Sequence, residues 1–219
     1  YWVTAILTTI ALYGTTYWML RGPGDSAFWF FLSGLVGILT SVAFVYITYY
    51  YTGKQHRPVQ AIADASKTGH ATNIIAGTAV GMESTGLTVI TVCAALFLSY
   101  WCGIQTGIPS GGLYGTAVAT MGMLSVVAYV LAMDMFGPIT DNAGGIVEMS
   151  HSAESVRRVT DELDATGNTT KALTKGYAVG SAALAAFLLF SAYLEEAHLF
   201  SVDLARVEVF IGAFLGAMI

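Results

Sequence analysis

Three acidic residues stand seven positions apart in a stretch of the chain that is otherwise largely apolar. They are Asp134, Asp141 and Glu148. In an α-helix this spacing places all three on one face, which drifts by only about 20° per step. Because a carboxylate inside an apolar helix is costly unless it faces a polar interior, the spacing predicts an acidic ladder that points into a cavity. The alternative is that the helix emerges into water there, which accounts best for Glu148 and least for Asp134.

A second group of polar residues follows about twenty positions later. Asn168, Lys171 and Lys175 lie at i, i+3 and i+7, so they share one helix face. We expect a helix to begin at Asn168 after a short loop, so that its unpaired N–H groups form a site for an anion. Asn168 as a simple N-cap and lysines that reach lipid head groups are the structural alternatives. Carboxylates hold hard cations and lysines meet phosphate oxygens, so the two faces together favour a metal–phosphate site.

The composition indicates what kind of protein must position these groups. Of 219 residues, 55% are hydrophobic and only 11% are charged, against about 25% charged in a typical soluble domain. So few charges cannot cover so much apolar surface, which predicts that lipid surrounds most of the chain. The net charge of −5 gives no support for a nucleic-acid partner. We therefore expect an all-α, multi-spanning transmembrane helix bundle.

Apolar runs of roughly 20 residues are long enough to cross a bilayer. The chain opens and stops within such runs, so we expect an internal piece of a longer protein. The six expected spans, the last of them truncated, are residues 1–20, 27–52, 73–103, 112–149, 168–193 and 207–219.

Basic residues assign an orientation to these spans. The connection 53–69 carries Lys54, Arg57 and Lys67, and the connection 151–167 carries Arg157 and Arg158. The alternate connections hold Arg21, the acidic pair Glu195 and Glu196, and Arg206 near the last span. The positive-inside rule therefore predicts that the first two connections are cytoplasmic.

At these residues the sequence resembles the membrane-bound, ion-pumping inorganic pyrophosphatases. The matching stretches occur in the family's order and cover most of the chain from residue 53 onward. They are Arg-Pro-Val-Gln at 57–60, Thr-Gly-His-Ala-Thr-Asn-Ile-Ile at 68–75, Gly-Met-Glu-Ser at 81–84, Gly-Leu-Tyr-Gly at 112–115, the whole of 134–149, the whole of 161–170, and 175–184.

The resemblance implies both a fold and a site. The family fold has roughly sixteen spans, of which residues 1–219 would supply about six, including two inner helices. Asp141 would help to bind Mg²⁺ at the substrate, Asn168 would lie among the ligands of Mg–pyrophosphate, and Lys175 would contact the pyrophosphate. No catalytic residue is implied within this chain, because the carboxylates that activate water would lie outside it, and the chain alone should be inactive. The expected activity of the complete protein is pyrophosphate hydrolysis coupled to ion transport.

Lys171 and Thr174 narrow the expected class. Members of the family that require K⁺ have Ala at the first position and usually Gly near the second, whereas members with Lys and Thr resemble the K⁺-independent proton pumps. An ammonium group can replace the charge of K⁺ directly. The resemblance therefore implies a K⁺-independent proton pump. The alternatives are a Na⁺-pumping member, and a secondary transporter that uses the acidic ladder as a proton relay.

The remaining expectations concern surroundings. Membrane lipid and a second copy of the chain, as a homodimer, are the expected partners besides pyrophosphate. A bacterial plasma membrane is the first expectation for location, with an acidocalcisome or vacuole membrane as the alternative.

Overall fold

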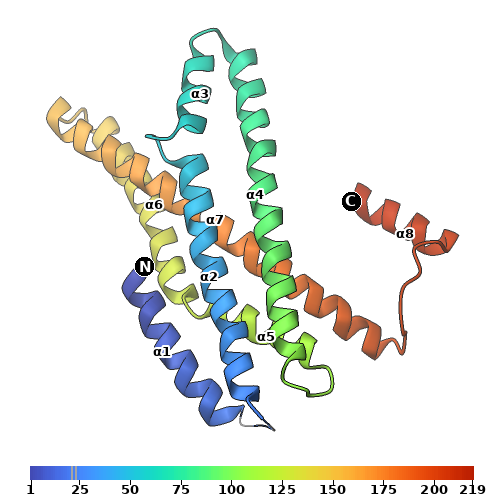
Figure 1. The fold of residues 1–219 in the computed structure, drawn as a ribbon. Coiled ribbons are helices and arrows are strands. Elements are labelled where there is room, and N and C mark those ends of the chain that lie inside the picture. Colours follow the sequence, from blue (N-terminus) through green and yellow to red (C-terminus); the bar gives the residue numbers. More distant parts are fainter. Residues whose placement is uncertain (21, 23) are drawn as a thin grey trace. The chain divides into compact units, whose positions relative to one another are not determined.

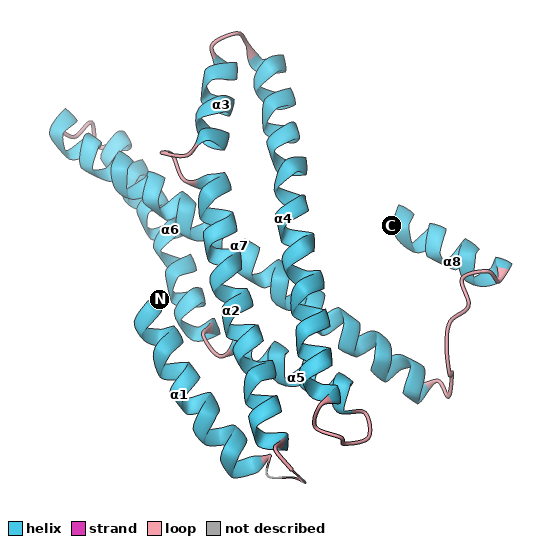
Figure 2. Cartoon of the chain, viewed as in Figure 1, coloured by secondary structure: helices cyan, strands magenta, loops and turns pink. Residues whose placement is uncertain are grey.

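Helices form every regular element that the structure describes. The structure is a computed structural model that describes residues 1–219 except 21 and 23, and within those residues it holds no strand (Figure 2). The expected Arg21 therefore lies outside the described residues. The helices are α1 (Trp2–Met19), α2 (Ser26–Thr52), α3 (Arg57–Ser66), α4 (His70–Ile104), α5 (Gly111–Leu124), α6 (Val127–Met149), α7 (Glu154–Glu196) and α8 (Val207–Met218).

Helices suit an apolar chain in lipid, because every backbone polar group then finds a partner within its own segment. By length and composition, three helical segments can cross a membrane: Ser26–Ser66, His70–Ile104 and Glu154–Glu196. The bent pair of α5 and α6 would be a fourth. These counts refer to the described residues, and the six spans expected from the sequence stay a prediction.

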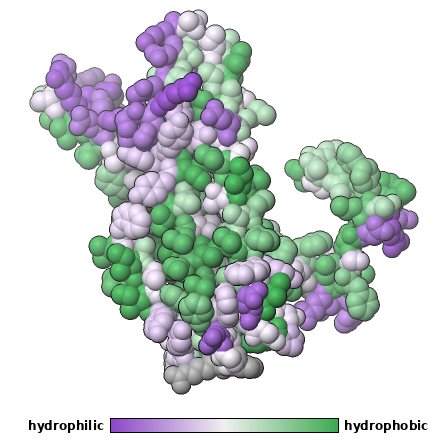
Figure 3. Space-filling model, in the orientation of Figure 1, coloured by the Kyte–Doolittle hydropathy of each residue, from purple (hydrophilic) through white to green (hydrophobic). Residues whose placement is uncertain are grey.

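The chain divides into two compact units. The first, Tyr1–Ala185, holds α1 to α6 and most of α7, and the second, Ala186–Ile219, holds the end of α7 and α8 (Figure 1). In the first unit α2, α4 and α5 pack tightly against one another. Hydrophilic residues gather over α3 and over the adjoining ends of α6 and α7, on the face shown in Figure 3. The two connections predicted to be cytoplasmic thus lie toward the same end of this unit.

The expected span 112–149 is two helices, bent by 42° at a short break. Pro138 lies inside the continuous α6, so it is not where the helix is interrupted. The break falls at Ser125 and Val126 instead, where the Ser125 hydroxyl donates to the backbone carbonyl of Gly122 at 2.6 Å. A serine hydroxyl that donates to a backbone carbonyl in this way competes with the hydrogen bonds of the helix backbone.

One prediction about the next helix is wrong. α7 does not begin at Asn168; it begins at Glu154, so Asn168 is in the second third of a 43-residue helix and its N–H group lies inside the ladder. Salt bridges four residues apart, Arg158 to Glu154 and Arg157 to Asp161, support the early turns. Gly167 looks like a helix breaker in the sequence, but it is buried where α7 crosses α6. A Cβ there would lie 3.0 Å from the Cα of Gly137.

Two hydrogen bonds fix α7 to its neighbours near the site. The buried Tyr177 hydroxyl donates to the backbone carbonyl of Met123, at the end of α5, at 2.6 Å. The buried Thr174 hydroxyl donates at 3.3 Å to the carbonyl of Val130 on α6. Because the partners are backbone groups in an apolar interior, these contacts set the height and rotation of α7.

Candidate functional site

Lys171 connects the two helices that carry the charged residues. Its ammonium group forms an ion pair with the Asp141 carboxylate on α6. The stem of the lysine lies directly over Gly137, where any Cβ would overlap its methylene groups. The side chain of Lys171 is 25% exposed and that of Asp141 is 48% exposed, so this pair is partly shielded from water. The absence of a side chain at position 137 is therefore what allows the ammonium to reach Asp141.

Asn168 and Asp164 extend this contact along α7. The Asn168 amide nitrogen donates to Oδ2 of Asp164 at 3.1 Å, and Nζ of Lys171 donates to the Asn168 amide oxygen at 3.5 Å. Asp141 and Asp164 are close enough to influence each other electrostatically. The four side chains form a compact cluster that joins α6 and α7, which we call the Lys171 cluster: Asp141, Asp164, Asn168 and Lys171.

A second ion-pair group lies on the side of this cluster nearer the α6–α7 connection. Arg157 pairs with Glu148 on α6 and donates from Nε to Asp161 at 3.1 Å on its own helix. The guanidinium group thus joins the end of α6 to the start of α7. Among the residues that the structure describes, its neighbour Arg158 pairs only with Glu154, four residues back on the same helix.

Carboxylates from both groups line one pocket of about 250 Å³. Its lining consists of four carboxylates, one guanidinium and two glycines: Asp141, Glu148, Asp161, Asp164, Arg157, Gly144 and Gly145. Both glycines face open space, since a Cβ at either would meet nothing within 4 Å.

The donors of this pocket suit a divalent cation only in part. Carboxylate oxygens are the ligands that Mg²⁺ prefers. Oδ1 of Asp164 is buried and accepts no hydrogen bond from the described residues, so it is available as a ligand. However, no group of three His, Cys, Asp or Glu residues in the described part of the chain has the geometry to hold a metal. Asp141 and Asp164 therefore fit as part of a metal site whose other ligands come from elsewhere.

The structure places the other predicted site residues outside this cluster. Asp134 lies two turns back along α6 and is half-buried, and it does not line the pocket. Lys175 is exposed one turn beyond Lys171. Thr174 is buried between α7 and α6, where it is a packing residue.

The acidic ladder is thus divided in the structure. Asp141 pairs with Lys171 and Glu148 pairs with Arg157. Their carboxylates do not form a continuous free row, because each is neutralised by a different cation from α7.

Two residues of the site were missed from the sequence. Asp164 lies four positions before Asn168, on the same helix face, but the expected start of the helix at Asn168 placed it in a loop. Nothing in the sequence singled out Gly137. Extending the predicted helix back to Glu154 would have placed Asp164 on the same face as Asn168. Gly137 could be recognised only once the position of the Lys171 stem was known.

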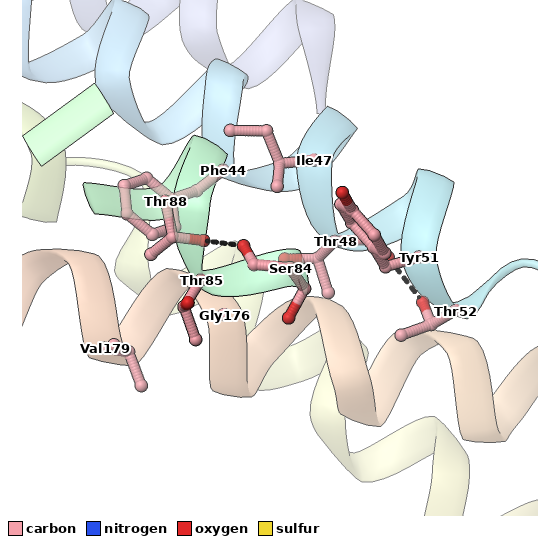
Figure 4. Close-up of a pocket in the computed structure, with 10 residues that line it drawn as sticks. All are labelled: Phe44, Ile47, Thr48, Tyr51, Thr52, Ser84, Thr85, Thr88, Gly176 and Val179. Carbon is pink, nitrogen blue, oxygen red and sulfur yellow. Dashed lines mark hydrogen bonds between the residues drawn. The ribbon is translucent and has the colours of Figure 1, made fainter. Parts of the chain in front are cut away.

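A second pocket, of about 270 Å³, lies between α2, α4 and α7. Figure 4 shows that its polar lining consists of hydroxyl groups, and no lining residue carries a charge: Phe44, Ile47, Thr48, Tyr51, Thr52, Ser84, Thr85, Thr88, Gly176 and Val179. Most of these threonine and serine hydroxyls donate to carbonyls of their own helices, as Thr88 does to Ser84 at 3.0 Å. The Tyr51 hydroxyl, at 3.3 Å from Oε1, is the one that reaches Glu83. This pocket has none of the charges that would bind a metal phosphate.

The fold and the pocket together define an all-helical membrane protein with a charged site where two of its helices meet. Comparison with known proteins then gives the family. The sequence matches the inorganic H⁺ pyrophosphatase family over residues 1–219, and the chain belongs to that family.

Three relatives illustrate the similarity. The chain is 60% identical to the K(+)-insensitive pyrophosphate-energized proton pump 2 of Moorella thermoacetica, over all of this chain and 33% of that protein. It is 58% identical to the K(+)-insensitive pyrophosphate-energized proton pump of Caldanaerobacter subterraneus, over all of this chain and 33% of that protein. It is 55% identical to the pyrophosphate-energized membrane proton pump 3 of Arabidopsis thaliana, over all of this chain and 29% of that protein. The chain thus spans about a third of the length of these relatives.

Proposed function

We propose that this chain is a segment of a proton pump that hydrolyses inorganic pyrophosphate with Mg²⁺ on the cytoplasmic side and does not require K⁺. Membership of the family and the names of the similar proteins support this proposal. The observation that carries it is the ion pair of Lys171 with Asp141, because it puts a fixed positive charge beside a carboxylate suited to a metal.

In this proposal the residues of the chain have distinct roles. Asp141 donates a carboxylate oxygen to Mg²⁺, Asn168 offers its amide oxygen to the metal–pyrophosphate complex, and the exposed Lys175 contacts a phosphate oxygen. Bound Mg²⁺ would neutralise the charge that develops on the phosphoryl oxygens. We assign no residue of this chain to the activation of water.

Lys171 has the role that K⁺ would otherwise fill. Its ammonium group is held between the Asp141 carboxylate and the Asn168 amide oxygen, two groups that would also attract a monovalent cation. A cation tethered to α7 is present at every K⁺ concentration. Thr174 supports the position of the lysine because its hydroxyl donates to the backbone of α6 and so holds α7 in place.

The alternatives receive less support. The similar proteins are named as proton pumps, which disfavours transport of Na⁺. A proton relay through Asp134, Asp141 and Glu148 would need free carboxylates, whereas two of the three are paired with cations. Location in a bacterial plasma membrane and assembly as a homodimer in lipid are proposals that follow from the family alone.

Phosphate release by membranes that contain the full-length protein tests the proposed function. With Mg²⁺ and pyrophosphate, we expect hydrolysis in K⁺-free buffer and acidification of the far compartment. Strong stimulation of the unmodified protein by K⁺ would contradict the class, and absence of hydrolysis would contradict the activity.

Lys171→Ala tests the role of the ammonium group. We expect hydrolysis by this variant to fall in K⁺-free buffer and to recover when K⁺ is added. The matched control is Lys67→Ala, which removes an exposed lysine whose one ionic partner in the described part of the chain is Asp64, three residues away. Equal rates for Lys171→Ala with and without K⁺ would refute the role.

A further inference from the structure

Asn168 has an amide group whose two ends have opposite hydrogen-bonding character. The nitrogen can only donate and the oxygen can only accept, so the neighbours of the amide decide which end faces which way. Here the nitrogen faces Asp164 and the oxygen faces the ammonium group of Lys171. The orientation of this amide therefore determines whether the position of Lys171 favours or repels a cation.

Asp164 is the residue that can fix this orientation. An ionised carboxylate has no hydrogen to donate, so it accepts from the amide nitrogen and disfavours the flipped arrangement. The 3.1 Å bond joins residues four apart on the same helix face, a spacing that a regular helix holds without strain. Lys171, a donor only, favours the same orientation from the other side.

We propose that Asp164 is a positioning residue that acts through Asn168, holding its amide oxygen toward the place that a cation occupies beside Asp141. The inference rests on the proposed function, and it adds a residue to the part of the site that sets cation preference. Asp164 lies one helical turn from Asn168 and two from Lys171, and it needs no contact with the substrate to act in this way.

The first experiment uses the full-length protein with Lys171→Ala, so that K⁺ affinity can be measured from the activation of hydrolysis. Adding Asp164→Asn should raise the K⁺ concentration for half-maximal activation about tenfold, the scale of one charge-assisted hydrogen bond. An asparagine at 164 can donate or accept, so it no longer selects one orientation of the amide. Adding Asp164→Glu should largely restore the affinity.

Glu162→Gln is the matched control in the same background. It removes one negative charge from the same helix, two residues away on a different face, and its exposed side chain makes no hydrogen bond with the described residues. The control should leave the K⁺ concentration for half-maximal activation unchanged. If the control and Asp164→Asn raise it equally, the effect is one of net charge and the proposal is overturned.

A second measurement separates this proposal from the proposed function. Melting temperatures of the solubilised full-length protein are compared for Asp164→Asn, Asn168→Ala and the double variant, without substrate. Asp164→Asn should lower the melting temperature of the unmodified protein but have almost no effect once Asn168 is alanine. Additive effects would overturn the positioning role even in a protein that does not hydrolyse pyrophosphate. Absence of hydrolysis with a non-additive cycle would overturn the proposed function alone.

Discussion

The packing of α2 against α5 and the packing of α6 against α7 both depend on glycine, but the glycines accommodate different neighbours. Between α2 and α5, glycines let one backbone touch another: a Cβ at Gly37 would overlap the carbonyl of Ala119, and a Cβ at Gly122 would overlap that of Gly34. Between α6 and α7, Gly167 also lies close to the backbone of the other helix, but Gly137 makes room for the stem of a charged side chain. In lipid, close approach of small residues supplies much of the attraction between helices.

This difference indicates how the chain separates stability from chemistry. The α2–α5 contact is apolar and its hydroxyl groups are satisfied by their own helices, as Thr120 is by Thr116 at 2.9 Å. The α6–α7 contact contains ion pairs that are accessible to water. Changes in the first region should therefore alter folding, and changes in the second should alter activity while the fold persists.

The largest expected effect in the charged region comes from Asp141→Asn. We expect hydrolysis of pyrophosphate by the full-length protein to fall on the order of 100-fold or more, the scale of losing one electrostatic contact to a transition state. The melting temperature should change little, because the side chain is half exposed. Full activity in this variant would remove Asp141 from the metal site.

Gly122→Ala is the corresponding change in the tightly packed region. The new methyl group would overlap the Gly34 carbonyl, so the helices must separate, at a cost of about 3 kcal/mol in the free energy of unfolding. Thermal unfolding of the solubilised full-length protein measures this. The control is Gly86→Ala on α4, where a Cβ meets nothing within 4 Å and where alanine should be neutral or mildly stabilising. Equal melting temperatures for the two variants would abolish the contrast between the regions.

Gly137→Ala tests whether the glycine of the second region serves the lysine. The added methyl group displaces the Lys171 stem, so hydrolysis in K⁺-free buffer should fall about fivefold and recover when K⁺ is added. Combining it with Lys171→Ala removes the overlap, and that double variant should behave like Lys171→Ala alone. A further loss in the double variant would mean that Gly137 serves backbone packing, as Gly122 does.

The smallest effect distinguishes two neighbouring arginines. Arg157 joins α6 to α7 through two carboxylates, whereas Arg158 pairs within α7 and both partners are about 80% exposed. Arg157→Ala should lower the free energy of unfolding by about 1 kcal/mol and Arg158→Ala by less than about 0.5 kcal/mol. Melting temperatures at low and high salt check this, because screening should reduce the difference between them.

Much of this arrangement could be predicted from the sequence. The scarcity of charge predicts helices in lipid, and the spacing of Asp141 and Lys171 on two successive helices predicts that an acidic and a basic face lie close together. The structure brings these two residues into an ion pair. Such patterns are readable because helical periodicity depends only on residue type and position.

What could not be predicted depends on contacts between helices. Gly167 looks like the end of a loop, yet it lies inside α7 because α6 approaches so closely there that only glycine fits. The break at Ser125 was likewise hidden, because serine is tolerated in many helices. The proposed role of Asp164 was missed because of the first of these errors, since a residue assigned to a loop has no defined helix face.

The bend between α5 and α6 has a mechanical consequence. α7 runs past this joint as one uninterrupted rod, held on one side by the Tyr177 bond to Met123 at the end of α5. It is held on the other side by the Thr174 bond to Val130 and by the Lys171 ion pair, both on α6. Tyr177 lies six positions after Lys171, which is about 9 Å along a helix. α7 therefore bridges the bend between α5 and α6 as a splint does, because it is bonded to the helix on each side of that bend.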